Sequence, residues 1–215
     1  MKRFLNLVAT LTIIGILGWA APTQAATITY TETSIASGTL GGTPFTDALV
    51  TIELTGDTSG VIEPEPVALP GFFSNAGIAT LTIDGLGTAT FNSPDGYSAI
   101  LFPPAAIPIC PCFSIFEGGT GIFGLFDPSL TGYDLRSAFG PLTSTGGGLA
   151  TNPDGSPVAF STTAGILFLT DGGDSVTFTA TVAPTAVPEP ASLSLFAIGA
   201  LSAIAARRRR RRQNS

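Results

Sequence analysis

The middle of the chain alternates apolar and polar side chains with a period of two. Between residues 26 and 182, aliphatic or aromatic residues occupy every second position of several runs, and threonine fills most positions between them. The clearest runs are Ile28 to Thr31, Val50 to Leu54, Ala79 to Asp84 and Val176 to Val182. Such alternation is typical of a strand with one buried face, and β-branched threonine favours strands. We therefore predict a β domain over residues 26–182.

Glycine, proline and aspartate cluster between these runs, where consecutive strands need turns. The predicted turns are Leu40-Gly41-Gly42, Gly56-Asp57, Asp84-Gly85, Pro94-Asp95-Gly96, Pro153-Asp154-Gly155 and Asp171-Gly172-Gly173-Asp174. Two denser apolar runs, Ser98 to Phe102 and Ile166 to Leu169, predict central strands. No convincing helix is predicted between Ala26 and Val187. About eight to ten short strands favour an all-β fold, an antiparallel β-sandwich or jelly roll.

The first 25 residues have the order of a secretory signal peptide. A short basic start precedes an apolar run from Phe4 to Ala21, and small residues follow a helix-breaking proline. That order predicts a signal helix over residues 1–25, which the Sec translocon reads and signal peptidase cleaves between Ala25 and Ala26. An uncleaved membrane anchor is the alternative interpretation.

Three features follow one another after the β domain. Val187, Pro188, Glu189 and Pro190 come first, the uncharged apolar run 191–206 follows, and Arg207, Arg208, Arg209, Arg210, Arg211 and Arg212 come last. As a helix the apolar run spans about 24 Å, which is short of the roughly 30 Å hydrocarbon core. Arginine stems recover part of that difference, and arginine clusters stay cytoplasmic. We predict a linker over 183–190, a transmembrane helix over 191–206 and a cytoplasmic tail over 207–215.

This ordered combination resembles the PEP-CTERM sorting signal of bacterial surface proteins. In that family a Pro-Glu-Pro motif precedes a short transmembrane helix and an arginine cluster. The resemblance implies recognition of Val187 to Pro190 by exosortase, a membrane-embedded, cysteine-dependent, transpeptidase-like enzyme, with Arg207 to Arg212 as the stop signal. It also implies passage through the inner membrane of a Gram-negative-type bacterium to the cell surface or extracellular matrix. Exopolysaccharide is then a candidate partner, and an unprocessed tail-anchored membrane protein is the alternative.

A second Pro-Glu-Pro sequence provides an internal comparison. Pro64, Glu65 and Pro66 repeat the motif inside the β domain, but no apolar helix or arginine run follows them. We predict that this copy lies in a loop and is not processed.

The charge distribution excludes several classes of function. The chain has a net charge of −6 and no histidine. Residues 26–186 carry fourteen acidic residues against Arg136 alone, a net charge of −13. Nucleic-acid binding is disfavoured, because phosphate contacts need a basic face. Without histidine, the Ser/His and Cys/His nucleophile pairs and histidine-ligated metal sites are absent. We expect a structural or interaction role without catalysis and without a cofactor.

Few residues of the β domain suggest chemistry of their own. Cys110 and Cys112 form a candidate disulfide, with a redox or metal site and inter-chain pairing as alternatives. Asp171 and Asp174, with Asp154 or Asp95, can offer oxygens to Ca²⁺, although a hairpin turn is the favoured interpretation of 171–174. The pair Glu63 and Glu65 flanks a proline in a polar stretch, which is unfavourable for a glycoside hydrolase.

Phenylalanines are the remaining candidates for a binding surface. Phe72, Phe73, Phe116, Phe123 and Phe126 are expected to lie mainly in the core, and a carbohydrate-facing aromatic strip is the alternative. The chain is therefore interpreted as an exported structural or interaction protein, with a carbohydrate-binding or Ca²⁺-dependent adhesive module as the second interpretation.

Overall fold

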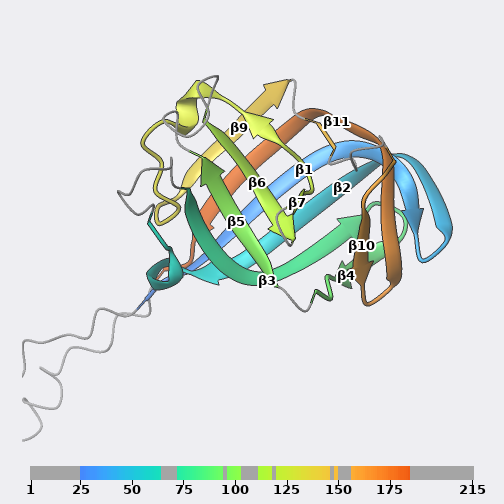
Figure 1. Cartoon of the computed structure of the whole chain (residues 1–215), viewed down its shortest axis with the longest axis horizontal. Coiled ribbons are helices and arrows are strands. Elements are labelled where there is room, and N and C mark those ends of the chain that lie inside the picture. Colours follow the sequence, from blue (N-terminus) through green and yellow to red (C-terminus); the bar gives the residue numbers. More distant parts are fainter. Residues whose placement is uncertain are drawn as a thin grey trace, which may run out of the picture. The chain divides into compact units, whose positions relative to one another are not determined.

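The computed structural model describes residues 25–63, 72–93, 96–102, 111–117, 120–145, 148–149 and 156–184. They belong to one compact unit, Ala25–Pro184, which is almost entirely β (Figure 1). The helical elements in this described part are two short 3₁₀ turns, η1 (Thr58–Gly60) and η2 (Pro128–Leu130), and none of its helices has the length and apolarity to cross a membrane. The all-β prediction is confirmed. Apart from Ala25, the predicted signal helix over 1–25 lies outside the described residues. The predicted transmembrane helix over 191–206 and tail over 207–215 also lie outside them, as does the predicted linker over 183–190 after residue 184.

Eleven strands follow one another along the chain, and all their pairings are antiparallel. They are β1 (Thr27–Leu40), β2 (Thr43–Asp57), β3 (Phe73–Ile83), β4 (Gly87–Thr90), β5 (Tyr97–Phe102), β6 (Cys112–Glu117), β7 (Thr120–Gly121), β8 (Leu125–Phe126), β9 (Phe139–Thr145), β10 (Ala159–Thr162) and β11 (Gly165–Val182). The predicted central strands correspond to β5 and the first part of β11.

The eleven strands form a single curled sheet, whereas the turn spacing favours two packed sheets. The order is β10-β11-β1-β2-β3-β5-β6-β7, with β4 paired to β3, β8 to β6 and β9 to β11. The length of the central strands explains the difference, because β1, β2 and β11 contain 14, 15 and 18 residues. Strands twist right-handedly, so a sheet of long strands coils and brings its two halves face to face.

Hydrogen bonds join the two ends of the curled sheet. Beyond β4, Asn92 donates its N–H to the Ser161 carbonyl oxygen of β10 at 2.8 Å. On the other side of the sheet, the Ser144 hydroxyl of β9 donates to the Phe126 carbonyl oxygen of β8 at 2.6 Å. The sheet therefore encloses one core between its halves.

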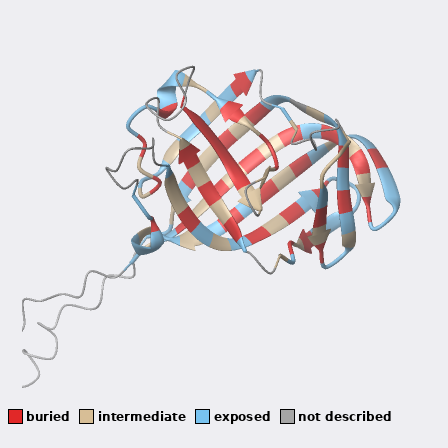
Figure 2. Ribbon diagram, viewed as in Figure 1, coloured by how far each residue is buried: buried red, intermediate tan, exposed pale blue. Residues whose placement is uncertain are grey.

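The core consists of the apolar positions of the alternating runs. All of the following are buried: Ile28, Tyr30, Val50, Ile52, Leu54, Ala79, Leu81, Ile83, Val176, Phe178 and Ala180. Figure 2 shows the resulting alternation of buried and more exposed positions along the long strands. Phe113 of β6 packs against Phe178 of β11, with ring centroids 4.1 Å apart, and against Tyr30 of β1 at 6.0 Å. Aromatic contacts therefore connect the two halves of the sheet.

The segment Asp171 to Asp174 is not the predicted hairpin turn, because β11 continues through it. The register between β1 and β11 shifts here, between Ser34 and Ala36 and again between Ser37 and Gly38. A Cβ atom on Gly172 would lie 2.6 Å from the Ala36 Cβ, so the glycine permits a close strand approach. These residues form β-bulges inside a long strand.

The other predicted turns have mixed outcomes. Turns occur at Gly41-Gly42 and at Asp84–Leu86, as predicted. Gly56 and Asp57 instead end β2, and the Asp57 carboxylate accepts the Ser59 N–H at 2.7 Å to begin η1. The turns predicted at 94–96 and 153–155 lie partly or wholly outside the described residues.

Candidate functional site

Of the predicted processing sites, the structure describes the signal cleavage site and not the C-terminal sorting signal. Val187 to Pro190, Arg207 to Arg212 and the second Pro-Glu-Pro at 64–66 lie outside the described residues. The predicted signal cleavage site lies at the start of the β unit, where the Ala26 N–H donates to the Thr58 hydroxyl at 3.1 Å. The bond between Ala25 and Ala26 therefore immediately precedes the first residue that is fixed by the sheet.

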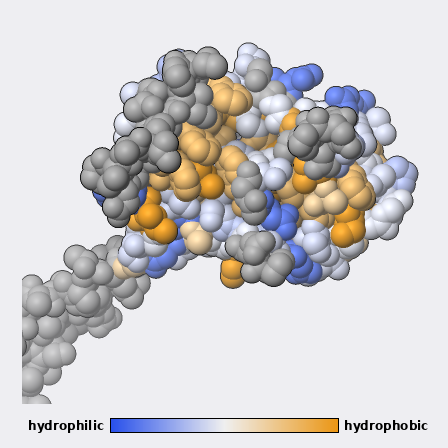
Figure 3. Space-filling model, viewed as in Figure 1, coloured by the Kyte–Doolittle hydropathy of each residue, from blue (hydrophilic) through white to orange (hydrophobic). Residues whose placement is uncertain are grey.

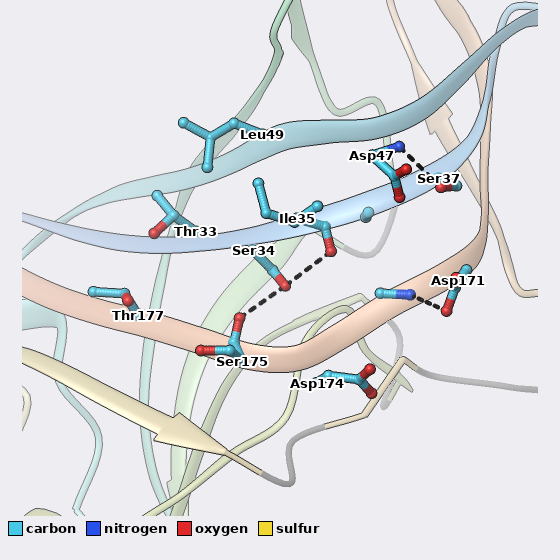
Figure 4. Close-up of a pocket in the computed structure, with 12 residues that line it drawn as sticks. Thr33, Ser34, Ile35, Ser37, Asp47, Leu49, Asp171, Asp174, Ser175 and Thr177 are labelled. Atoms are coloured by element: carbon cyan, nitrogen blue, oxygen red, sulfur yellow. Dashed lines mark hydrogen bonds between the residues drawn. The ribbon is translucent and has the colours of Figure 1, made fainter.

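A groove of about 360 Å³ lies on the outer face of β1, β2 and β11. It is lined by Thr33, Ser34, Ile35, Ala36, Ser37, Asp47, Leu49, Asp171, Gly172, Asp174, Ser175 and Thr177 (Figure 4). The groove coincides with the register shifts between β1 and β11, where regular pairing is interrupted. Bulges of this kind redirect side chains and are frequent beside binding sites.

The apolar part of the groove is a cross-strand pair. Ile35 of β1 faces Leu49 of β2 in the strand register. Their side chains are 54% and 47% exposed, although the sheet has a large buried face on its other side. Two adjacent aliphatic side chains at the surface form a small apolar contact area for a ligand.

The polar part of the groove carries negative charge. Asp47, Asp171 and Asp174 line it, and the groove contains no basic residue. The Asp47 N–H donates to the Ser37 hydroxyl at 3.1 Å, and the Asp171 carboxylate accepts the Gly172 N–H at 2.9 Å. Below them, the Ser34 hydroxyl donates to the Ser175 carbonyl oxygen at 2.9 Å and links β1 to β11.

The carboxylates of the groove do not form a compact metal site. Within the described ranges, no three His, Cys, Asp or Glu residues converge closely enough to hold a metal ion. Asp95 and Asp154, the other residues predicted to contribute to a Ca²⁺ site, lie outside those ranges. Ca²⁺ binding therefore stays a prediction.

The remaining sequence candidates are dispersed. Cys112 is buried at the start of β6, whereas Cys110 lies outside the described residues, so their disulfide stays a prediction. Glu63 forms an ion pair with Arg136 at 2.6 Å. The same guanidinium donates to the Val61 carbonyl oxygen at 3.1 Å. Glu65 lies outside the described residues, so the structure does not describe a carboxylate pair there.

The phenylalanines divide between the core and the surface. Phe123 is fully buried, as expected, whereas Phe72 and Phe126 are each 44% exposed. On the outer face, the Phe102 ring lies 5.6 Å from that of Phe72 and 5.9 Å from that of Phe116. Figure 3 shows apolar surface gathered over β5 and β6, where this aromatic row lies. A mainly apolar hollow of about 320 Å³, lined in part by Phe116, Phe126 and Leu149, adjoins it.

Two buried polar groups were not predicted from the sequence. Glu32 projects into the core with 0% exposure, and Asn75 is equally buried. The Asn75 side-chain amide donates to the Tyr30 hydroxyl at 2.8 Å, and this hydroxyl donates to the Leu135 carbonyl oxygen at 2.5 Å. Burial raises the pKa of Tyr30 to about 12. The signal for Glu32 was present in the alternation, because it occupies the next inward position after Ile28 and Tyr30.

One known family model matches the chain, in its C-terminal part. Residues 186–211 match the family described as the PEP-CTERM protein-sorting motif. The match contains the predicted recognition residues 187–190, the predicted membrane segment and five of the six arginines. Neither a curated protein nor a solved structure shows significant similarity to the chain.

Proposed function

This chain carries a PEP-CTERM protein-sorting motif, the recognition signal of exosortase, and from that premise we propose a surface or extracellular-matrix protein with a structural or interaction role. The motif implies export and membrane-associated processing toward the cell surface. In the proposed route, the Sec translocon exports the chain and signal peptidase removes residues 1–25. Exosortase then acts at 187–190 in the inner membrane of a Gram-negative-type bacterium.

The match at 186–211 is the observation that carries this proposal. The chemistry of the motif is consistent with recognition by a membrane enzyme. Pro188 and Pro190 restrict φ and remove two backbone donors, which favours an extended segment beside the membrane. The arginines after residue 206 favour a cytoplasmic end for the tail.

The C-terminal mass of the protein isolated from its own cells tests the processing step. We expect a terminus within or just after residues 187–190, without the arginine run. A Glu189→Gln variant is expected to accumulate with its tail intact. The matched control is Glu65→Gln, which changes the second Pro-Glu-Pro and is expected to be processed normally. A tail that persists in the exported wild-type protein would establish an unprocessed membrane anchor and exclude the proposed route.

The groove supports a second candidate function, a carbohydrate-binding or Ca²⁺-dependent adhesive module. Ile35 and Leu49 offer an apolar contact to the C–H face of a sugar ring, and Thr33, Ser37 and Thr177 place hydroxyl groups beside it. Asp171 and Asp174 line the same groove, and in the Ca²⁺-dependent form their carboxylates would supply part of the ligands of a cation that the glycan also binds.

Pull-down on exopolysaccharide from the source cells, with and without EDTA, distinguishes the two functions. An adhesive module binds the glycan, and its Leu49→Ser variant binds less. Loss of binding in EDTA identifies the Ca²⁺-dependent form. Ile78→Ser is the matched control, because Ile78 is 70% exposed but does not line the groove. Absence of glycan binding in both conditions excludes the adhesive module and leaves the passive structural role.

A further inference from the structure

Glu32 is the one acidic or basic side chain buried within the described part of the chain. It lies on the inner face of β1 and is 0% exposed. Its register partners on the two neighbouring strands are Ile52 of β2 and Phe178 of β11, both fully buried. The strand alternation therefore directs a carboxyl group into an apolar core.

The carboxyl group reaches across the core to a strand that is distant in the sheet order. Glu32 Oε2 accepts the backbone N–H of Ile115 in β6 at 3.4 Å. Between β1 and β6 the sheet contains β2, β3 and β5, so this bond joins the two facing halves. It is a polar link beside the aromatic contacts of Phe113.

Ile115 lies at an interruption in the pairing of β6. On that edge, β8 pairs with Cys112 and Phe113, and β7 pairs with Phe116 and Glu117. The Ile115 carbonyl oxygen accepts the Ile122 N–H at 3.0 Å, and the Ile115 N–H has the carboxyl of Glu32 as its acceptor. Glu32 thus satisfies a buried backbone donor that the short strands β7 and β8 leave between them.

No positive charge compensates the Glu32 carboxyl among the described residues. Its Oε1 atom has no hydrogen-bond partner there. The basic residue of this part of the chain, Arg136, is engaged with Glu63 and the Val61 carbonyl oxygen. The other titratable groups buried in the described core are the phenols of Tyr30, Tyr97 and Tyr133 and the thiol of Cys112 on the opposite face of β6. At the end of β6, Glu117 accepts the Tyr97 hydroxyl at 2.7 Å.

We propose that Glu32 is a proton-dependent latch, which in its neutral form holds β6 against β1 across the core and on ionisation releases β6 with β7 and β8. An ionised carboxylate without a counter-charge is strongly disfavoured in an apolar core. Because β6 carries β7 and β8 at one edge of the sheet, its release opens the enclosed core.

Burial supports the proposal by raising the pKa of Glu32 well above its usual range, with the Ile115 hydrogen bond as a weaker opposing effect. In the unfolded chain the carboxyl ionises near the ordinary value of about 4.3. Above that pH the native state retains a proton that the unfolded state has lost, so stability decreases as pH rises. The folding constant is expected to fall about tenfold per pH unit until the native carboxyl also ionises.

Urea denaturation of the full chain in detergent micelles, between pH 4 and pH 9, tests the latch. The wild-type midpoint is expected to fall with rising pH, and the profile of Glu32→Gln is expected to be flatter. The matched control is Glu53→Gln on the exposed face of β2, whose profile should stay parallel to that of the wild type. Parallel profiles for the wild type and Glu32→Gln would overturn the proposal.

A second measurement uses the wild-type chain and therefore tests the latch even if Glu32→Gln does not fold. In ¹³C NMR of labelled glutamate, the side-chain carboxyl of Glu32 is expected to stay neutral at pH values above the ordinary glutamate value of about 4.3. Once Glu32 ionises, amide exchange of Ile115 is expected to increase at least tenfold relative to Leu81, which lies in the core of β3. Ionisation of Glu32 near the ordinary glutamate value of about 4.3, or a constant ratio of the Ile115 and Leu81 exchange rates, would refute the latch.

Discussion

The side-chain amide of Asn75 in β3 donates a hydrogen bond to the hydroxyl of Tyr30 in β1, at 2.8 Å, in the interior of the curled sheet. The same hydroxyl donates to the Leu135 carbonyl oxygen, so one phenol serves two buried polar groups. Tyr30→Phe removes both bonds, and we expect the free energy of unfolding to fall by about 1–3 kcal/mol. Urea denaturation measures the change.

Tyr133→Phe is the control for that prediction. The Tyr133 hydroxyl donates to the Ser137 carbonyl oxygen, at 3.2 Å and in a partly buried position. Its loss should cost at most about 1 kcal/mol. Equal costs for the two variants would contradict the importance of the Asn75–Tyr30 bond.

The tips of two hairpins meet at a glycine contact. A Cβ atom on Gly165 would lie 2.6 Å from the Gly41 Cα, and Gly165 has a φ of 110°. Gly165→Ala is expected to lower the free energy of unfolding for two reasons, backbone strain and steric overlap, which cost about 1–3 kcal/mol each. Urea denaturation measures the loss. Gly42→Ala separates the two effects, because Gly42 has a φ of 85° but no atom within 4 Å of the added Cβ. If Gly165→Ala lowers the free energy of unfolding no more than Gly42→Ala does, the two hairpins can move apart without cost.

The contribution of Asp127 to stability is expected to depend on pH with a sign opposite to that of Glu32. Hydrogen bonds from the Ser129 hydroxyl and N–H lower the pKa of Asp127 below its usual range. The stabilisation is therefore present above the ordinary value of about 3.9 and is lost as pH falls through the lowered pKa. Asp127→Asn should retain acceptor geometry and show a flatter urea profile below pH 4. Identical urea profiles for Asp127→Asn and the wild type below pH 4 would refute this role.

The ion pair between Arg136 and Glu63 is expected to contribute little to stability. The Glu63 side chain is 64% exposed and that of Arg136 is 36% exposed, and pairs near the surface contribute about 0.2–1 kcal/mol. Glu63→Gln should therefore lower the free energy of unfolding by less than about 1 kcal/mol, and the difference should shrink in 1 M salt, where the Debye length is about 3 Å. A salt-independent loss above about 2 kcal/mol would show a larger structural role for this carboxylate.

The alternation of apolar and polar residues predicted the strands. The features that it did not predict depend on contacts between residues that are distant in the sequence. The inward positions Ile52, Leu81 and Phe178 follow from period two alone, because a strand alternates its faces. Gly172 was predicted to lie in a turn because glycine and aspartate are turn residues. Its role in a close strand approach depends on Ala36, more than a hundred residues away in the sequence.

The groove and the buried carboxyl were missed for a related reason. Ile35, Leu49 and Asp171 come together only through the register of three strands, which the alternation does not specify. Glu32 occupies an inward position in the alternation, but its polarity favours an exposed interpretation. Only the facing strand β6, with its interrupted pairing at Ile115, explains why a carboxyl group is accommodated there.

The first and last strands of the described unit begin and end side by side. The Ala183 N–H donates to the Thr27 carbonyl oxygen at 2.9 Å, and the ladder between β11 and β1 continues from Val182 through Val176 toward the groove. A pulling force between a C-terminal attachment and a ligand in the groove would act along these strands. Such a force would stretch the hydrogen bonds between β1 and β11 simultaneously, in shear, and would not break them one after another. The domain would therefore resist best a force that acts along these two strands, which is the direction of a pull on a C-terminal attachment.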